Sequence, residues 1–311
     1  MRTTLPRCAL ACLAAASVAA ASAHHDDRND VRPALEAGTL PDRWTPAAGD
    51  GQPCDRTPPF RAHEYNPGFF IIRQSGCTNF EKPFLYLILG SREALLVDTG
   101  AAGADPVAIV DDLLGRDAAR RHAAPLPLAV VHSHGHGDHV AGDAALRNRP
   151  NTRVVAATPD AVAQFFAVAR WPETNGRYDL GDRMIDAIPI PGHERASVAL
   201  YDARTGILLT GDTLYPGRLY VRDAAAFRAS VDRLVTFTAA RPVAHVLGAH
   251  IENRRTPFLD YPEGTTFQPE EHALELGRAH LLELQDALRQ MAGAIVRRPL
   301  RDFTVWPIEP K

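Results

Sequence analysis

The sequence predicts a mixed α/β (α+β) fold in which sheets are covered by helices. Short apolar runs bounded by glycine, proline and asparagine alternate along the chain with segments of helical periodicity. Neither an internal repeat nor a sharp change in composition divides the 311 residues, so a single large domain is the simpler interpretation. A chain of this length can bury a sizeable core.

The N-terminus has the three-part pattern of a secretory signal peptide. Arg2 and Arg7 precede an alanine-rich apolar run that ends in Ala-Ser-Ala at 21–23. We therefore expect cleavage after Ala23 and a periplasmic or secreted protein. The run is shorter than the roughly 20 residues that a membrane-spanning helix needs, and no later segment is long and apolar enough either. A lipoprotein acylated at Cys12 is the alternative, although the apolar stretch before this cysteine is too short.

Charge and cysteine content limit the possible partners of the mature chain. Removal of residues 1–23 takes away two arginines and no acid, so the formal charge moves from −3 to −5. Because no basic block is present, we expect a small-molecule substrate, no nucleic acid and no membrane partner after cleavage; the oligomeric state stays open. Cys54 and Cys77 remain after cleavage, and they form either one disulfide or two free thiols.

The first part of the mature chain, residues 24–60, is polar and rich in proline, glycine and aspartate. We interpret it as an extended leader before a folded domain at 61–311. Strand-like runs then follow at 68–74, 84–89 and 94–97, which indicates an antiparallel meander.

The pattern changes to alternating helices and strands after Gly100. Val107, Val110 and Leu113 have helical spacing within 105–120, and an apolar strand is expected at 126–131. Further strands are expected at 154–157, 185–190, 197–201, 206–210 and 244–248, and further helices at 160–169, 224–240 and 270–292.

Directly after the strand at 126–131 the chain reads His-Ser-His-Gly-His-Gly-Asp-His. Within it, the pattern HxHxDH falls on His134, His136, Asp138 and His139. A loop at a strand end can hold imidazoles about 2.0–2.1 Å from zinc. Imidazole and carboxylate suit zinc, manganese or iron, whereas calcium needs a mostly oxygen cage. A surface histidine cluster without metal is the alternative.

Four more candidate residues follow apolar strands, which argues against a surface cluster. Asp98 lies in Asp-Thr-Gly, His193 in Pro-Gly-His, Asp212 in Thr-Gly-Asp-Thr and His250 in Leu-Gly-Ala-His. Side chains at such positions emerge at the edge of a sheet, where they can converge on one site.

With these motifs in this order, residues 68–250 resemble the metallo-β-lactamase superfamily. The resemblance implies a four-layer αββα sandwich, with two mixed sheets flanked by helices and a metal cleft at one edge of the sheets. It also implies two divalent metal ions, with zinc as first choice and manganese or iron as alternatives. By this resemblance one ion would be held by His134, His136 and His193, the other by Asp138, His139 and His250, and Asp212 would bridge them. Asp98 would orient the HxHxDH loop.

Two positions depart from the pattern of the family. Glu194 stands where the family often has threonine or serine, and His132 is extra to the motif, so we interpret His132 as a supporting or core residue. The remaining histidines have no motif context and are interpreted as ordinary surface or core residues: His24, His25, His63, His122, His245, His272 and His280.

The expected function is metal-dependent hydrolysis of an ester, thioester, lactone or lactam by a metal-bridging hydroxide. Asp138 could also accept a proton. Tyr215, Arg218 and Tyr220 are candidate substrate contacts, with packing and surface solvation as the alternative role. Asp212 looks more like the glyoxalase II and lactonase type than the lactamase type.

Three other functions are weighed against this one. A β-lactamase suits the expected compartment, whereas glyoxalase II does not, because its glutathione thioester is cytosolic. A non-haem iron oxidoreductase of the two-iron type would typically replace a histidine of HxHxDH by glutamate, which is not seen. A non-catalytic metal-binding protein would be expected to lack some of the ligands.

Overall fold

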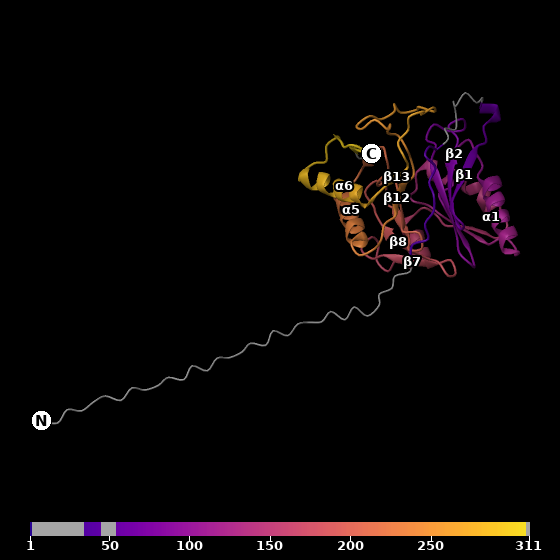
Figure 1. Ribbon diagram of the computed structural model, residues 1–311, viewed down its shortest axis with the longest axis horizontal. Helices are drawn as coiled ribbons and strands as arrows, with labels where there is room; N and C mark the ends of the chain where they lie inside the picture. The colour runs from indigo at the N-terminus through magenta and orange to yellow at the C-terminus, as the bar shows by residue number, and fades with distance from the viewer. Residues whose placement is uncertain (2–33, 45–53, 309–311) are drawn as a thin grey trace. The chain divides into compact units, whose positions relative to one another are not determined.

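Two six-stranded sheets lie face to face in the computed structural model (Figure 1). The structure describes Met1 and residues 34–44 and 54–308, and the two ranges belong to the compact unit Ala34–Lys311. The expected signal peptide at 1–23, its cleavage site and most of the leader lie outside the described residues. None of the helices in the described ranges combines the length and apolarity that crossing a membrane requires.

The first sheet has its strands in chain order. They are β1 (Phe60–Asn66), β2 (Phe69–Gln74), β3 (Phe84–Leu89), β4 (Ala94–Val97), β5 (Leu128–Val131) and β6 (Thr152–Val154). The first four form an antiparallel meander, whereas β4, β5 and β6 are parallel. The carboxyl ends of β4 and β5 therefore meet at one edge, and both lead into expected site residues.

The second sheet has the order β13-β12-β10-β9-β8-β7. Its strands are β7 (Gly176–Asp179), β8 (Met184–Pro189), β9 (Val198–Asp202), β10 (Ile207–Gly211), β12 (His245–Gly248) and β13 (Glu275–Leu276). Only β10 and β12 are parallel. A third, small sheet consists of β11 (Arg218–Val221), β15 (Thr304–Pro307) and β14 (Arg298–Pro299).

Alternation along the strands divides the core into three layers, because successive strand side chains point to opposite faces. Phe69 and Ile71 belong to the cluster between the two sheets, whereas Phe70 and Ile72 pack under α1 (Val107–Arg121). The other sheet is covered by α5 (Ala224–Thr238) and α6 (Arg278–Gln290), which lie on the side away from α1 (Figure 1). The observed architecture is therefore the expected four-layer αββα sandwich.

A buried arginine, Arg183, joins the two sheets at the edge away from the site. Arg183 and Asp202 have side chains that are 1% and 2% exposed, and their atoms Nη2 and Oδ2 lie 2.5 Å apart. Arg183 Nη1 also donates to the carbonyls of Gly68 and Leu89 in the first sheet, at 2.8 and 3.0 Å. These bonds satisfy the buried charge, as a pair removed from water requires.

Every element expected between 68 and 248 overlaps an observed one. The shorter helices are α2 (Gly137–Val140), α3 (Asp143–Arg147) and α4 (Pro159–Phe166), and a 3-10 helix spans Cys54–Arg56. Cys54 is joined to Cys77 by a disulfide, so of the two alternatives the free thiols are wrong.

The expected helix at 270–292 is wrong at its start, because α6 begins only at Arg278. Residues Glu275–Leu276 form the edge strand β13 and pair with β12, so their backbone groups are already bonded within the sheet. Gly277 then adopts an extended conformation as N-cap of the helix. The strands β1, β7, β11, β14 and β15 were also not expected, since most of them lack a continuous apolar run.

Candidate metal centre

Five strands deliver the expected site residues to one edge of the two sheets. Asp98 follows β4, the histidine loop follows β5, and His193, Asp212 and His250 follow β8, β10 and β12. The structure gathers seven of these side chains into two groups whose ligand atoms lie within 4.8 Å of one another in each group. One group is His134, His136 and His193, and the other is Asp138, His139, Asp212 and His250.

In the three-histidine group the ring nitrogens face one another. His136 Nδ1 lies 2.9 Å from His134 Nε2 and 3.0 Å from His193 Nε2. His193 donates its Nδ1 proton to the carbonyl of Tyr220 at 2.8 Å, so its Nε2 carries the lone pair. Lone pairs this close repel unless a proton or a cation lies between them, so this arrangement fits a metal ion.

The second group combines two histidines with two carboxylates. Asp138 Oδ2 lies 3.2 Å from His139 Nε2 and 3.3 Å from His250 Nε2. His250 donates its Nδ1 proton to the carbonyl of Glu81 at 3.0 Å, which leaves its Nε2 facing the carboxylates. This mixture of imidazole nitrogen and carboxylate oxygen suits zinc, manganese or iron.

Asp212 lies between the two groups. Its Oδ2 is 3.8 Å from His134 Nε2 and 3.5 Å from His193 Nε2. Its Oδ1 is 3.6 Å from His139 Nε2 and 3.5 Å from His250 Nε2, and this buried oxygen has no hydrogen-bond partner among the described residues. One carboxylate oxygen thus faces each group, which is the placement that a residue shared by two cations requires.

Protonation differs between the two groups. Burial lowers the pKa of His134, His136 and His193, so these rings are neutral ligands near pH 7. Burial also acts to lower the pKa of His250, but Asp212 and Asp138 outweigh it and raise this pKa to about 9. A cation entering the second group would therefore displace protons, as expected where carboxylates gather around imidazoles.

Asp98 holds the histidine loop in place by accepting three hydrogen bonds from it. Its Oδ1 accepts the backbone N–H of Ser133 at 2.7 Å, and its Oδ2 accepts Ser133 Oγ at 2.8 Å and His139 Nδ1 at 2.9 Å. The bond to His139 leaves Nε2 of that ring free to face the site. Asp98 has a φ of 66°, a left-handed conformation that aspartate and asparagine tolerate better than most residues.

The two departures from the family pattern lie beside the centre rather than in it. His132 Nε2 is 2.8 Å from Asp143 Oδ1 on α3, which ties the start of the loop to that helix. Glu194 Oε2 accepts the backbone N–H of Ala196 at 2.7 Å and so closes the turn after His193. Neither belongs to the two ligand groups.

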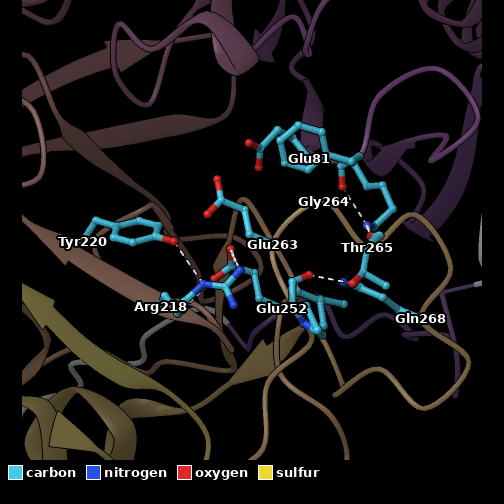
Figure 2. A pocket seen from close by; sticks show the side chains of 12 residues that line it. Glu81, Arg218, Tyr220, Glu252, Glu263, Gly264, Thr265 and Gln268 are labelled. Atoms are coloured by element: carbon cyan, nitrogen blue, oxygen red, sulfur yellow. Dashed lines mark hydrogen bonds and ion pairs between the residues drawn. The ribbon is translucent and has the colours of Figure 1, made fainter. Parts of the chain in front are cut away.

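A cavity of about 370 Å³ opens beside the ligands. Besides ligand residues, it is lined by Glu81, Tyr215, Tyr220, Arg222, Glu252, Glu263 and Ile308. A smaller cavity of about 140 Å³ adjoins it and shares Glu81, Tyr220, Glu252 and Glu263, whose side chains gather around it in Figure 2.

The three expected substrate contacts differ in availability. Tyr215 is fully buried and its hydroxyl donates to the carbonyl of Arg218 at 2.5 Å. The guanidinium of Arg218 is bound by Glu252 at 2.7 Å and Asp260 at 2.9 Å. Tyr220 accepts a bond from Arg218 Nε at 3.0 Å and borders both cavities, so its hydroxyl proton remains available.

Sequence reasoning missed Arg222, Glu81 and Glu263 as residues of the cavity. Arg222 follows Tyr220 by two residues but lies just beyond β11, a strand that the sequence did not predict, so no pattern pointed to it. Glu81 and Glu263 lie in loops without a periodic pattern.

Comparison with known proteins identifies relatives of this chain. Residues 80–250 match the model of a family described as the metallo-beta-lactamase superfamily. The acyl-coenzyme A thioesterase MBLAC2 of Bos taurus is 30% identical over 182 residues, 49% of this chain and 65% of the relative. The hydroxyacylglutathione hydrolase of Thermosynechococcus vestitus is 34% identical over 116 residues, 34% of this chain and 43% of the relative.

The chain thus spans less than two thirds of the length of either relative. Among solved structures, a metallo-beta-lactamase from Pontibacter korlensis has a TM-score of 0.50 at 15% identity. It covers 74% of this chain and 99% of its own. At this level of identity the likeness concerns the fold alone.

Proposed function

Because this chain belongs to the metallo-β-lactamase superfamily, we propose that it is a dinuclear metal-dependent hydrolase of an acyl bond. The bond is an ester, thioester, lactone or lactam. The two relatives described above are a thioesterase and a hydrolase of an acylated glutathione, and both activities are hydrolysis at an acyl carbon.

The placement of Asp212 carries the proposal of two ions. One oxygen of its carboxylate faces the three histidines and the other faces His139 and His250. A carboxylate shared in this way would offset the repulsion between two cations a few ångströms apart.

Bound in the two groups, divalent cations, with zinc as first choice, would supply Lewis acidity and a water molecule activated near neutral pH. None of the described residues that line the cavity is serine, threonine or cysteine, and we propose water as the nucleophile. The chain's own residues hold and protonate the reactants.

We assign this task to two side chains. The Asp138 side chain is 22% exposed and borders the cavity, so its carboxylate is a route for a proton from the attacking water to the leaving atom. The Tyr220 hydroxyl borders the cavity and would donate a hydrogen bond to a substrate oxygen.

We also propose that the protein is exported to the periplasm or secreted. The signal-peptide pattern supports this, and the disulfide between Cys54 and Cys77 suits an oxidising compartment. Cell fractionation with N-terminal sequencing tests the proposed export. The expected new N-terminus is His24, and an uncleaved chain found in the cytosol would contradict the proposal.

The activity is tested with protein loaded with zinc, manganese or iron and a panel of an aryl ester, a thioester, a lactone, a cephalosporin and a phosphodiester. We expect two ions per chain by elemental analysis and turnover of at least one acyl substrate, lost with chelator and restored by metal. Asp212→Asn should lower both the metal content and kcat.

A fully loaded protein that turns over none of the acyl substrates, or cleaves only the phosphodiester, would contradict the proposal. Oxygen consumption by the iron form would instead support an oxidoreductase. Cleavage of the cephalosporin alone would narrow the function to a β-lactamase.

A further inference from the structure

Arg222 is the cationic side chain of the main cavity that lacks a protein partner among the described residues. Its Nε is buried without a hydrogen-bond acceptor, whereas Arg218, four residues earlier, is bound by two carboxylates. Buried polar groups are nearly always hydrogen-bonded, so an orphan donor beside a cavity suggests that a ligand supplies the acceptor.

The backbone holds Arg222 next to a metal-ligand residue. The N–H groups of Arg222 and Asp223 both donate to the carbonyl of Gly192, at 3.0 and 2.9 Å. His193 Nδ1 donates to the carbonyl of Tyr220 at 2.8 Å, so the end of β11 is bonded to the Pro-Gly-His loop at both points. The backbone of Arg222 is therefore held beside His193.

The nearby carboxylates are engaged elsewhere. Asp223 accepts the N–H of Ala226 at 2.9 Å and caps α5, and Glu194 accepts the N–H of Ala196 at 2.7 Å. Arg222 also lines a groove of about 310 Å³ that continues from the cavity past His193 toward the first turn of α5. The Arg222 side chain thus borders both the cavity and the groove, where its positive charge can meet a ligand.

The opposite end of the cavity is acidic. Where it meets the smaller cavity it is lined by Glu81, Glu252 and Glu263 (Figure 2). Glu252 is neutralised by Arg218, and the ammonium of Lys82 is bound by the carbonyls of Phe80 and Thr265. Glu81 and Glu263 have no ion-pair partner among the described residues, so an anion is disfavoured at this end.

We propose that Arg222 binds a carboxylate of the substrate and so selects acyl substrates that carry one. This deepens the proposed hydrolase function and rests on it. A single negative charge matches one guanidinium, which can bind a carboxylate through two parallel hydrogen bonds. A phosphate dianion would keep an uncompensated charge in a cavity that also contains Glu81 and Glu263. The acidic end thus sets the direction in which the substrate lies.

The test compares two aryl esters or thioesters that differ in one group, succinyl with its free carboxylate and butyryl without it. We expect the metal-loaded wild type to favour succinyl in kcat/KM by about tenfold or more, the usual effect of a charge-assisted hydrogen bond. Arg222→Met should remove this preference by slowing succinyl alone, with butyryl within about twofold. Arg222→Lys should keep part of it.

Arg195 provides a matched control in the same groove, because its side chain is 82% exposed. Arg195→Met should keep the preference. The assignment would be overturned if Arg222→Met lowered kcat/KM equally for the succinyl and butyryl substrates. It would also be overturned if Arg195→Met, rather than Arg222→Met, removed the preference for succinyl.

A binding measurement decides the proposal without turnover. Calorimetry with the metal-loaded protein should show that Arg222→Met raises the Kd of succinate about tenfold or more and leaves that of butyramide, which has no carboxylate, nearly unchanged. If neither ester is hydrolysed but this difference appears, the hydrolase function fails and the carboxylate site stands. If inorganic phosphate binds the wild type more tightly than succinate and is lost in Arg222→Met, the carboxylate assignment is wrong.

Discussion

Replacement of Asp98 by asparagine should weaken metal binding while leaving the protein folded. The carboxylate is 1% exposed and accepts three hydrogen bonds of 2.7 to 2.9 Å from Ser133 and His139. Asparagine keeps the shape and tolerates the φ of 66°, but it lacks the charge and can accept at only one oxygen.

The magnitude follows from the lost bond to His139. Removing a partner that orients a metal-ligating histidine typically weakens metal binding about 10- to 100-fold. At about 1.36 kcal/mol per tenfold change, this is roughly 1.4 to 2.7 kcal/mol, close to the worth of one charge-assisted hydrogen bond. Most of this loss of metal affinity should fall on the group that contains His139. The Asp98 carboxylate forms no direct hydrogen bond with a histidine of the three-histidine group.

Zinc affinity is measured by competition with a chromogenic chelator, which resolves the weaker of two binding steps. Asp202→Asn is the control, since Asp202 is an equally buried carboxylate at the far end of β9 from the site, paired with Arg183. The control should lower the Tm and leave both zinc affinities unchanged. If folded Asp98→Asn bound zinc like the wild type, or both variants lost affinity alike, the positioning role of Asp98 would be refuted.

Three further perturbations test the fold around the site. Gly192→Ala should reduce stability by at least about 1–3 kcal/mol, because at φ +139° the added Cβ would lie 2.4 Å from Phe227 Cα; a thermal melt equal to that of the wild type would contradict this close contact. Burial lowers the pKa of Lys82 from 10.5 to about 8, so between these pH values the unfolded chain binds a proton that the folded chain does not. The free energy of unfolding should therefore rise with pH across this window by up to about 3 kcal/mol relative to Lys82→Met, and parallel urea-unfolding results from pH 7.5 to 10.5 would refute it. Cys54→Ser should lower the free energy of unfolding by about 3 kcal/mol, as expected for a loop closed over 23 residues, and an unchanged urea midpoint would show that the bond to Cys77 adds no stability.

Much of the fold could be predicted because its signals are local. The continuous apolar runs of β2, β3 and β4 and the helical spacing in α1 are visible in short windows, and each overlaps its expected range. The start of α6 was not visible, because pairing of β13 with a strand some thirty residues away overrides local helical propensity.

The candidate ligands were also named from local signals, since each follows an apolar strand. The sequence by itself determined which seven side chains could bind metal, and their order along the chain limited the folds that could gather them. The net charge and the signal-peptide pattern at the N-terminus are also properties of the sequence alone.

Only the tertiary structure decided what surrounds them. Arg218 and Arg222 are the same residue type four positions apart, yet one is bound by Glu252 and Asp260 and the other faces the cavity with an unpaired Nε. Whether a charged side chain is neutralised depends on residues distant in sequence, and no pattern in a short window records these contacts. The same reason applies to the disulfide, which required two cysteines to meet through the packing of the loops that hold them.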